Sequence, residues 1–112
     1  MTLLRLIETT SGKYSLLLEA GTTPVEDLIR ELGHEPNGYF WEGVAQLLVS
    51  TEAQALEGRF AYDPEAGMFC AYGTDRSALE DLAARMSVVA TDGERLRRLV
   101  SGANASGFEF DD

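Results

Sequence analysis

One aromatic stretch constrains the fold of this chain more than any other: Pro36-Asn37-Gly38-Tyr39-Phe40-Trp41-Glu42-Gly43. It places three consecutive aromatic side chains, among them the only tryptophan, behind a Pro-Asn-Gly sequence that breaks regular structure. Three large aromatic side chains in a row cannot all point to one side of a helix or a strand. Either the local fold buries them on several sides, or at least one of them is left for a binding partner. We expect Phe40 and Trp41 to anchor the core, and Tyr39 and Glu42 to be exposed.

The chain is strongly acidic for its length. Its 112 residues carry 9 basic and 19 acidic side chains, which gives a formal net charge of −10 at pH 7. One interpretation is that this acidity only keeps the protein in solution. The other is that it accelerates the encounter with a basic protein partner, since such a charge repels nucleic acid and anionic lipid. On either interpretation we expect no nucleic-acid partner and no membrane partner.

Length and composition predict a single domain over residues 1–112. Hydrophobic residues make up 45% of the chain, which is typical of a globular protein. No apolar run approaches the ~20 residues that a membrane span needs, and the N-terminal residues lack the pattern of a secretory signal. Cys70 is the only cysteine, so no internal disulfide can form and nothing indicates an oxidising compartment. We therefore expect a cytoplasmic protein.

The first half of the sequence predicts two strands followed by two helices. Apolar segments at residues 3–7 and 14–18 flank a short loop that contains glycine, which is typical of a β-hairpin. A capping box over Thr23–Glu26 and a stop at Gly33 predict the first helix. The next helix is predicted over residues 37–50, where apolar residues recur at helical spacing.

The second half predicts the same order of elements. Residues 59–62 and 68–72 flank a turn at residues 63–67 that opens with Asp-Pro and closes with glycine, as in a second hairpin. A cap at Thr74-Asp75 and a capping box over Thr91–Glu94 predict the starts of two further helices.

Strand pairs that alternate with helix pairs predict an α+β fold of order ββαα-ββαα. In such a fold the two β-hairpins build one antiparallel sheet, and the helices pack on one of its faces. Gly107 is expected to end the last helix. Residues 108–112 then alternate between apolar and acidic side chains, which indicates a short C-terminal edge strand or an ordered tail.

The sequence contains no pattern typical of an enzyme. It has no phosphate-binding glycine loop, no G-x-S-x-G and no H-E-x-x-H. The lone histidine, His34, follows the stop of the first helix, where a structural role is expected, and Cys70 is expected to be a buried, inert thiol. No carboxylate set has the spacing of a calcium loop, and no His/Cys set suits zinc. We therefore predict no enzymatic activity, no catalytic residue, no cofactor and no bound metal.

Three groups of side chains are candidates for partner binding. Tyrosine and tryptophan often carry the binding energy of an interface, and carboxylates attract a basic partner. The candidates lie at the start of the second helix, in the turn of the second hairpin and at the end of the sequence: Tyr39, Trp41, Glu42, Asp63, Glu65, Glu109, Asp111 and Asp112.

Five stretches of the chain resemble the immunity protein 51 family of bacterial polymorphic toxin systems. They are PNGYFWEG, GVAQLL, FAYDPEAGMFCAYG, LEDLAARM and GFEFDD, of which the first and the last are the most specific. The resemblance spans essentially the whole chain and implies an α+β protein that binds and neutralises a cognate toxin domain, and so protects the producing cell. It places Tyr39–Glu42 in the family's aromatic motif and Asp111 and Asp112 in its acidic end. The family brings no catalytic residue with it.

The sequence leaves two other functions open beside stoichiometric occlusion of a basic toxin domain by an acidic surface. One is a small ligand-binding domain or a small enzyme with its pocket near Tyr39–Trp41, although no set of polar residues suits such a pocket and we expect no small-molecule substrate. The other is a structural adaptor that dimerises through an edge at Phe108–Phe110.

Overall fold

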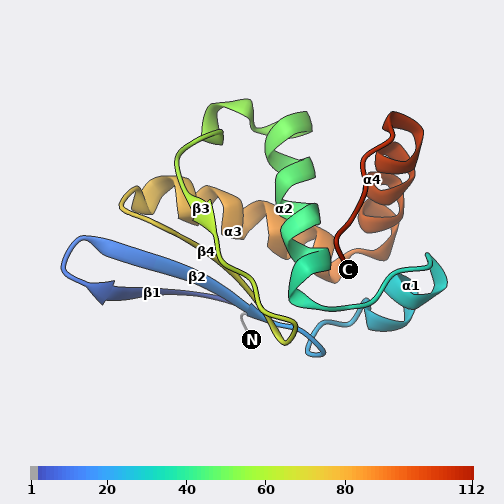
Figure 1. Cartoon of the computed structure of the whole chain (residues 1–112), viewed down its shortest axis with the longest axis horizontal. Coiled ribbons are helices and arrows are strands. Elements are labelled where there is room, and N and C mark those ends of the chain that lie inside the picture. Colours follow the sequence, from blue (N-terminus) through green and yellow to red (C-terminus); the bar gives the residue numbers. More distant parts are fainter. Residues whose placement is uncertain (1–2) are drawn as a thin grey trace.

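The computed structural model describes residues 3–112, which form a four-stranded antiparallel sheet with helices on one of its faces (Figure 1). The strands are β1 (Leu4–Thr10), β2 (Lys13–Glu19), β3 (Ala61–Tyr62) and β4 (Met68–Gly73), in the sheet order β1-β2-β4-β3. The helices are α1 (Glu26–Glu31), α2 (Gly38–Glu52), α3 (Arg76–Thr91) and α4 (Gly93–Ser106), with a short 3-10 helix, η1 (Gln54–Leu56), after α2. The predicted α+β fold and the order ββαα-ββαα are confirmed.

Alternation along the strands decides which face of the sheet the helices cover. The inward-facing side chains of the longer strands are buried, and they include Leu4, Leu16, Leu18, Phe69 and Ala71. Leu18 lies opposite both Leu4 and Phe69 in the strand register, so the apolar residues of neighbouring strands form a continuous surface. α3 packs across β1, β2 and β4, α2 packs on β4, and α4 packs on α2 and α3. We call the covered side of the sheet the inner face and the opposite side the outer face.

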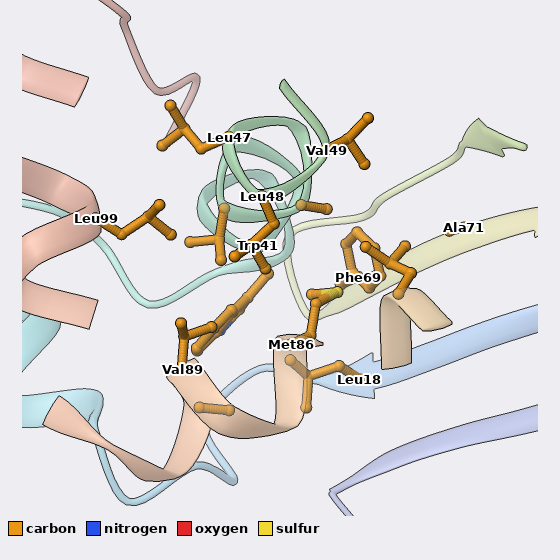
Figure 2. Close-up of a cluster of buried hydrophobic side chains, with 14 of the residues drawn as sticks. Leu18, Trp41, Leu47, Leu48, Val49, Phe69, Ala71, Met86, Val89 and Leu99 are labelled. Carbon is orange, nitrogen blue, oxygen red and sulfur yellow. The ribbon is translucent and has the colours of Figure 1, made fainter. Parts of the chain in front are cut away.

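Phe40 and Trp41 of α2 anchor the core between the helices and the inner face. Both side chains are fully buried, and their rings meet edge to face with 5.5 Å between the ring centroids. Figure 2 shows the Trp41 ring extending from α2 toward Val89 of α3, with Met86 and Phe69 nearby. Burying a large side chain in this way stabilises the fold by about 1.5–3 kcal/mol. The prediction that both residues are core anchors is confirmed.

The side chains of Asn37, Asp75 and Asp92 cap the three long helices. Each accepts a hydrogen bond from a backbone N–H of the first turn, at 2.9 Å for Asn37 and at 3.1 Å for Asp75 and Asp92. The predicted helix starts at residues 37 and 74–75 are therefore correct to within about two residues. The capping box predicted over Thr91–Glu94 is wrong by one residue, because Thr91 ends α3 and Asp92 supplies the cap.

The first helix is shorter than its sequence pattern predicts. α1 begins at Glu26, and its N-cap residue, Val25, offers no side-chain hydrogen bond. The Thr23 hydroxyl instead donates to Oε2 of Glu26 at 2.6 Å. The predicted capping role of Thr23 is therefore wrong, because a side-chain partner has replaced the helix amides. The stop at Gly33 is correct, since this residue has a φ of 87° that L side chains rarely adopt.

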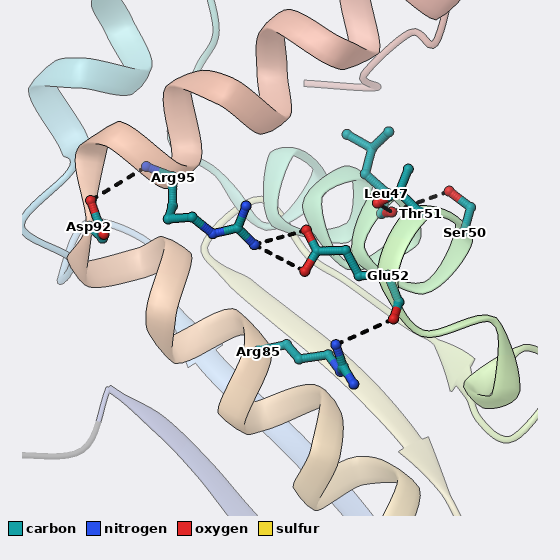
Figure 3. A network of polar contacts seen from close by, with 7 residues as sticks. All are labelled: Leu47, Ser50, Thr51, Glu52, Arg85, Asp92 and Arg95. Atoms are coloured by element: carbon teal, nitrogen blue, oxygen red, sulfur yellow. Dashed lines mark hydrogen bonds and ion pairs between the residues drawn. The ribbon is translucent and has the colours of Figure 1, made fainter.

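A single residue, Glu52, joins the end of α2 to both α3 and α4 (Figure 3). Nη2 of Arg95 in α4 donates to both Glu52 carboxylate oxygens, at 3.0 and 2.8 Å. Nη1 of Arg85 in α3 donates to the Glu52 backbone carbonyl oxygen at 3.5 Å. The Arg95 and Glu52 side chains are 31% and 32% exposed, so solvent weakens their attraction. The main effect of the Glu52 contacts is to fix how α2, α3 and α4 pack together.

Residues 108–112 form an ordered tail, and the predicted edge strand is wrong. The two edges of the described sheet are β1 and β3. α4 ends at Gly107, which has a φ of 82°, and the N–H of Phe108 returns to the carbonyl oxygen of Ala103 at 3.0 Å. This Schellman turn reverses the chain. Figure 1 shows the tail running back beside α2 toward the segment that joins α1 to α2.

Phe110 fastens the tail to α2 at a position where only glycine leaves room. Its ring stacks on that of Phe40, with 5.0 Å between centroids and 21° between planes, and meets the His34 ring edge-on at 4.7 Å. A Cβ atom at Gly43 would collide with the Phe110 ring. Glycine inside a helix costs about 1 kcal/mol relative to alanine, and the docking of Phe110 explains why the chain carries one here.

This packing predicts opposite effects for the same substitution at two helical glycines. Gly43→Ala should lower the free energy of unfolding, because overpacking costs about 1–3 kcal/mol and outweighs a helix-propensity gain of at most about 1 kcal/mol. Gly102→Ala in α4 is the matched control, since a Cβ there meets nothing within 4 Å. It should raise the free energy of unfolding by about 0.5–1 kcal/mol. Urea unfolding measures both, and equal stabilisation by the two variants would contradict the docking of Phe110.

Candidate functional site

The structure separates the exposed carboxylates of the predicted site into two surfaces. Asp63 and Glu65 lie in the connection between β3 and β4, and we call this the turn surface. Residues from the start of α2 and from the tail form the second group, which we call the tail surface: Tyr39, Glu42, Glu109 and Asp111. Trp41 and Asp112 belong to neither surface, because the Trp41 side chain is fully buried and the Asp112 side chain is largely buried.

Backbone contacts fix the turn surface against α2. Glu65 and Met68 exchange two hydrogen bonds, of 2.8 and 3.1 Å between nitrogen and oxygen. The N–H of Gly38, at the start of α2, donates to the carbonyl oxygen of Ala66 at 3.0 Å. A Cβ atom at Gly38 would overlap the backbone of Glu65 and Met68. The glycine of the aromatic motif therefore allows the helix to meet the turn directly, and it holds the turn carboxylates in place.

Cys70 lies on the outer face beside the turn surface, and its thiol is half-buried. We predicted a buried, inert thiol, but Cys70 is only partly buried, because the residues next to it in β4, Phe69 and Ala71, take the inward positions. Burial raises the pKa of the Cys70 thiol, and the charges of Asp63 and Glu65 raise it further, against an opposing hydrogen bond with Ser15. Both carboxylates therefore act on the thiol electrostatically across the outer face.

Two hollows on the outer face meet at Asp63 and Cys70. The first has a volume of about 380 Å³ and is lined by residues of β1, β2 and β4 as well as by Asp63, among them Thr9, Ser15, Cys70 and Tyr72. The second, of about 180 Å³, is lined by Leu17, Asp63, Glu65, Met68 and Cys70. Because they share these two lining residues, we call the two hollows together the outer-face groove.

Sequence reasoning missed the apolar residues of this groove. Leu17, Met68 and Tyr72 alternate with buried residues of the same strands, so they point away from the core. This alternation is visible in the sequence and could have identified these residues as outward-facing. Recognising the groove also requires knowing that β2 pairs with β4, which places Leu17 opposite Cys70. No local pattern in the sequence gives that pairing.

At the start of α2, the structure divides the aromatic motif between core and surface. Tyr39 is 36% exposed and Trp41 is fully buried. The prediction that Trp41 contacts a partner is wrong, because its ring is enclosed between α2 and α3. Glu42 is partly buried on the tail surface. Burial raises the pKa of the Glu42 carboxyl, and the charge of Asp111 raises it further, so these two acids lie close together.

The carboxylate of Asp112 is used inside the molecule. Its side chain is only 11% exposed, and both of its oxygens lie 3.1 Å from Nδ1 of His34. It also accepts a hydrogen bond from the backbone N–H of Glu35 at 2.8 Å. The prediction that Asp112 is presented to a partner is therefore wrong, because its acceptors are occupied by the segment between α1 and α2. His34 has the expected structural role, although through the tail rather than through the helix end.

The hollows and the environments of His34 and Cys70 bear on the alternative of a small-molecule pocket or an enzyme near Tyr39–Trp41. A hollow of about 380 Å³ lies on another side of α2, where Phe60, Tyr62 and Phe108 line it. Burial, together with the charges of Glu57 and Glu42, raises the pKa of Tyr62 to about 12, so this phenol stays protonated at neutral pH. His34 hydrogen-bonds to Asp112, whereas Cys70 lies on the outer face of the sheet.

Residues 3–112 contain neither a membrane-spanning helix nor a cluster of metal ligands. None of the described helices is long and apolar enough to cross a membrane. In the same part of the chain, no group of three or more His, Cys, Asp or Glu side chains is arranged so that it could hold a metal ion.

The described residues form an α+β protein whose candidate binding side chains are mainly carboxylates on its surface. A family model described as Immunity protein 51 matches residues 4–105, which is most of the chain. The chain therefore belongs to the immunity protein 51 family, and the resemblance found in the sequence is confirmed. Membership supports a role as an immunity protein and suggests a non-enzymatic one. Comparisons with curated proteins and with solved structures gave no match.

The internal use of Asp112 predicts different effects for the two neighbouring acids of the tail. Asp112→Ala should lower the free energy of unfolding by about 1.5–3 kcal/mol, because it leaves hydrogen-bond partners of a charged group unpaired. Asp111→Ala removes an exposed side chain and should change stability by less than about 0.5 kcal/mol. Urea unfolding of both variants tests this difference. Equal losses would show that the tail is not held through the Asp112 carboxylate.

The electrostatic link between the turn surface and the thiol predicts a change in the reactivity of Cys70. The double variant Asp63→Asn, Glu65→Gln should lower the pKa of Cys70, since it removes two charges that raise it. The pH dependence of alkylation by iodoacetamide measures this pKa, because the thiolate is the reactive species. Glu94→Gln on α4 is the control for charge alone. If both variants moved the pH profile equally, the carboxylates would not face the thiol.

Proposed function

We propose that this chain is an immunity protein that binds a cognate toxin domain one to one in the cytoplasm of the producing bacterium and neutralises it by occlusion. The observation that carries the proposal is the family match over residues 4–105. The net charge of −10 supports a basic partner, because opposite charges steer two proteins together. Nucleic acid and anionic membranes are disfavoured as partners by the same charge, and the proposal needs no small-molecule substrate.

The exposed carboxylates give this proposal a physical mechanism. Asp63 and Glu65 on the turn surface, and Glu42, Glu109 and Asp111 on the tail surface, offer negative charge to a basic surface of the toxin. Tyr39 adds a partly exposed aromatic ring of the kind that contributes strongly to interfaces. A bound immunity protein then covers the toxin surface, so no turnover is required for protection. Trp41 and Asp112 contribute indirectly, because they hold the scaffold that presents these side chains.

A titration of toxin activity tests the proposal. The probe is the C-terminal toxin domain encoded by the adjacent reading frame, purified separately and mixed with this chain. Toxin activity should fall linearly and reach its minimum at equal molar amounts, and size-exclusion chromatography should give a complex of the summed mass. Co-expression should protect a sensitive bacterium. A toxin that stays fully active at a large molar excess of this chain would overturn the proposal.

Electrostatic steering predicts a strong dependence of association on salt. Raising the ionic strength from ~0.01 M to ~1 M shortens the screening length from ~30 Å to ~3 Å. The association rate constant should then fall by about ten- to a thousand-fold, because steering by charge is lost. The dissociation rate constant should change much less. Stopped-flow fluorescence of the complex measures both, and an association rate independent of salt would contradict a basic partner surface.

A further inference from the structure

The outer face of the sheet combines exposed apolar side chains with a groove. Tyr72 in β4 is 46% exposed and Ile7 in the edge strand β1 is 41% exposed, and both are large apolar residues. Leu17 and Met68 are half-buried beside them. Within residues 3–112 the helices cover only the opposite face. An antiparallel sheet can leave one face to water, but that face then usually carries polar residues. Apolar residues here indicate a surface that a partner covers.

The acidic end of the outer-face groove lacks a cationic partner. No ion pair or side-chain hydrogen bond in the described part of the chain involves the carboxylates of Asp63 or Glu65. The smaller hollow, which contains both of them, is lined by no lysine or arginine. On the same face, Arg5 lies 3.9 Å from Glu19, and Lys13 lines only the larger hollow. Negative charge is therefore left uncompensated where the two hollows meet.

Backbone contacts hold the segment that carries these carboxylates. Their turn is closed by the paired hydrogen bonds of Glu65 and Met68 and is fixed to α2 through Gly38. It is also fixed to the end of β2, because the N–H of Ala20 donates to the carbonyl oxygen of Gly67 at 3.0 Å. A backbone that is already ordered loses little conformational entropy on binding, so a partner has to order only the two side chains.

We propose that the toxin docks on the outer face of the sheet and inserts a lysine or arginine side chain into the acidic end of the outer-face groove. The hydrocarbon stem of that side chain lies on Leu17 and Met68, and its charged head lies between Asp63 and Glu65. Lysine and arginine bury their stems on apolar surface while the head stays with polar groups. This inference rests on the proposed immunity function and assigns that function to one surface.

The charge of the groove favours this occupant over a second copy of the chain. A dimer through the outer face would bring together two molecules that each carry a net charge of −10, and their mutual repulsion opposes it. A basic toxin reverses the sign of that interaction. The hollow beside the tail, where Phe60, Tyr62 and Phe108 lie, has Glu57 as the one carboxylate of its lining, whereas Asp63 and Glu65 both line the smaller hollow of the outer-face groove.

Charge reversal in the groove tests the proposal with the toxin domain encoded by the adjacent reading frame. Glu65→Lys should weaken binding by about 100-fold or more, because it places like charges against each other. Glu94→Lys on α4 is the matched control, since it changes the net charge equally, its side chain is exposed and α4 does not belong to the sheet. It should weaken binding by less than about tenfold, through steering alone. Thermal unfolding verifies that both variants are folded.

Cys70 provides a second readout that needs no substitution. Cys70 is the only cysteine of the chain, and it lines the smaller hollow of the groove together with Asp63 and Glu65. In the complex, alkylation of Cys70 by iodoacetamide should slow by about tenfold or more, as measured by mass spectrometry of this chain. A thiol that reacts equally fast in the complex and in the free protein would overturn the proposal.

The outcomes separate this inference from the function on which it rests. If the unmodified chain binds and neutralises the toxin while Glu65→Lys and Glu94→Lys bind equally well, the docking surface is wrong and the immunity function stands. If the unmodified chain neither binds nor neutralises the toxin, both proposals fail. If only Glu65→Lys loses binding and Cys70 is protected, the outer-face groove is the docking site.

Discussion

The contact between the aromatic motif and its two neighbours determines how the acidic surfaces are placed. At Gly38 the start of α2 meets the β3–β4 turn backbone to backbone, and at Gly43 the same helix accepts the ring of Phe110. Phe40 and Trp41 fill the core between these points. The exposed carboxylates of the turn and of the tail are therefore both positioned by one helical segment. In this protein the aromatic residues Phe40 and Trp41 build the scaffold, while the charges occupy the surface.

The sequence predicted the elements well because their signals are local. Alternation in the strands, caps at Asn37 and Asp75, and the stop at Gly107 each depend on residues within a few positions. The errors arose where a side chain other than the expected group supplies the contact. Thr23 resembles a helix cap but donates to the Glu26 side chain. The tail alternates between apolar and acidic residues as a strand does, but Phe110 packs against Gly43 and Phe40 of α2 and the tail does not join the sheet edge.

The candidate site was predicted in part for the same reason. Charge and turn chemistry identified Asp63 and Glu65 from the sequence, whereas the groove beside them exists only because β2 pairs with β4. Two acids of the tail that differ by one position have opposite environments: Asp111 is exposed and Asp112 is bound to His34. Exposure at the end of a chain depends on where that chain docks, which composition and periodicity do not encode.

The two faces of the sheet have different freedom to evolve. Residues such as Leu18 and Phe69 are each confined by neighbours from several elements, so a change in one of them disturbs the whole interior. The side chains that alternate with them, including the half-buried Leu17 and the exposed Tyr72, have neighbours on fewer sides. Substitutions on that face are expected to cost less stability than substitutions in the core. The chemistry of the outer face can therefore change while the fold beneath it is retained.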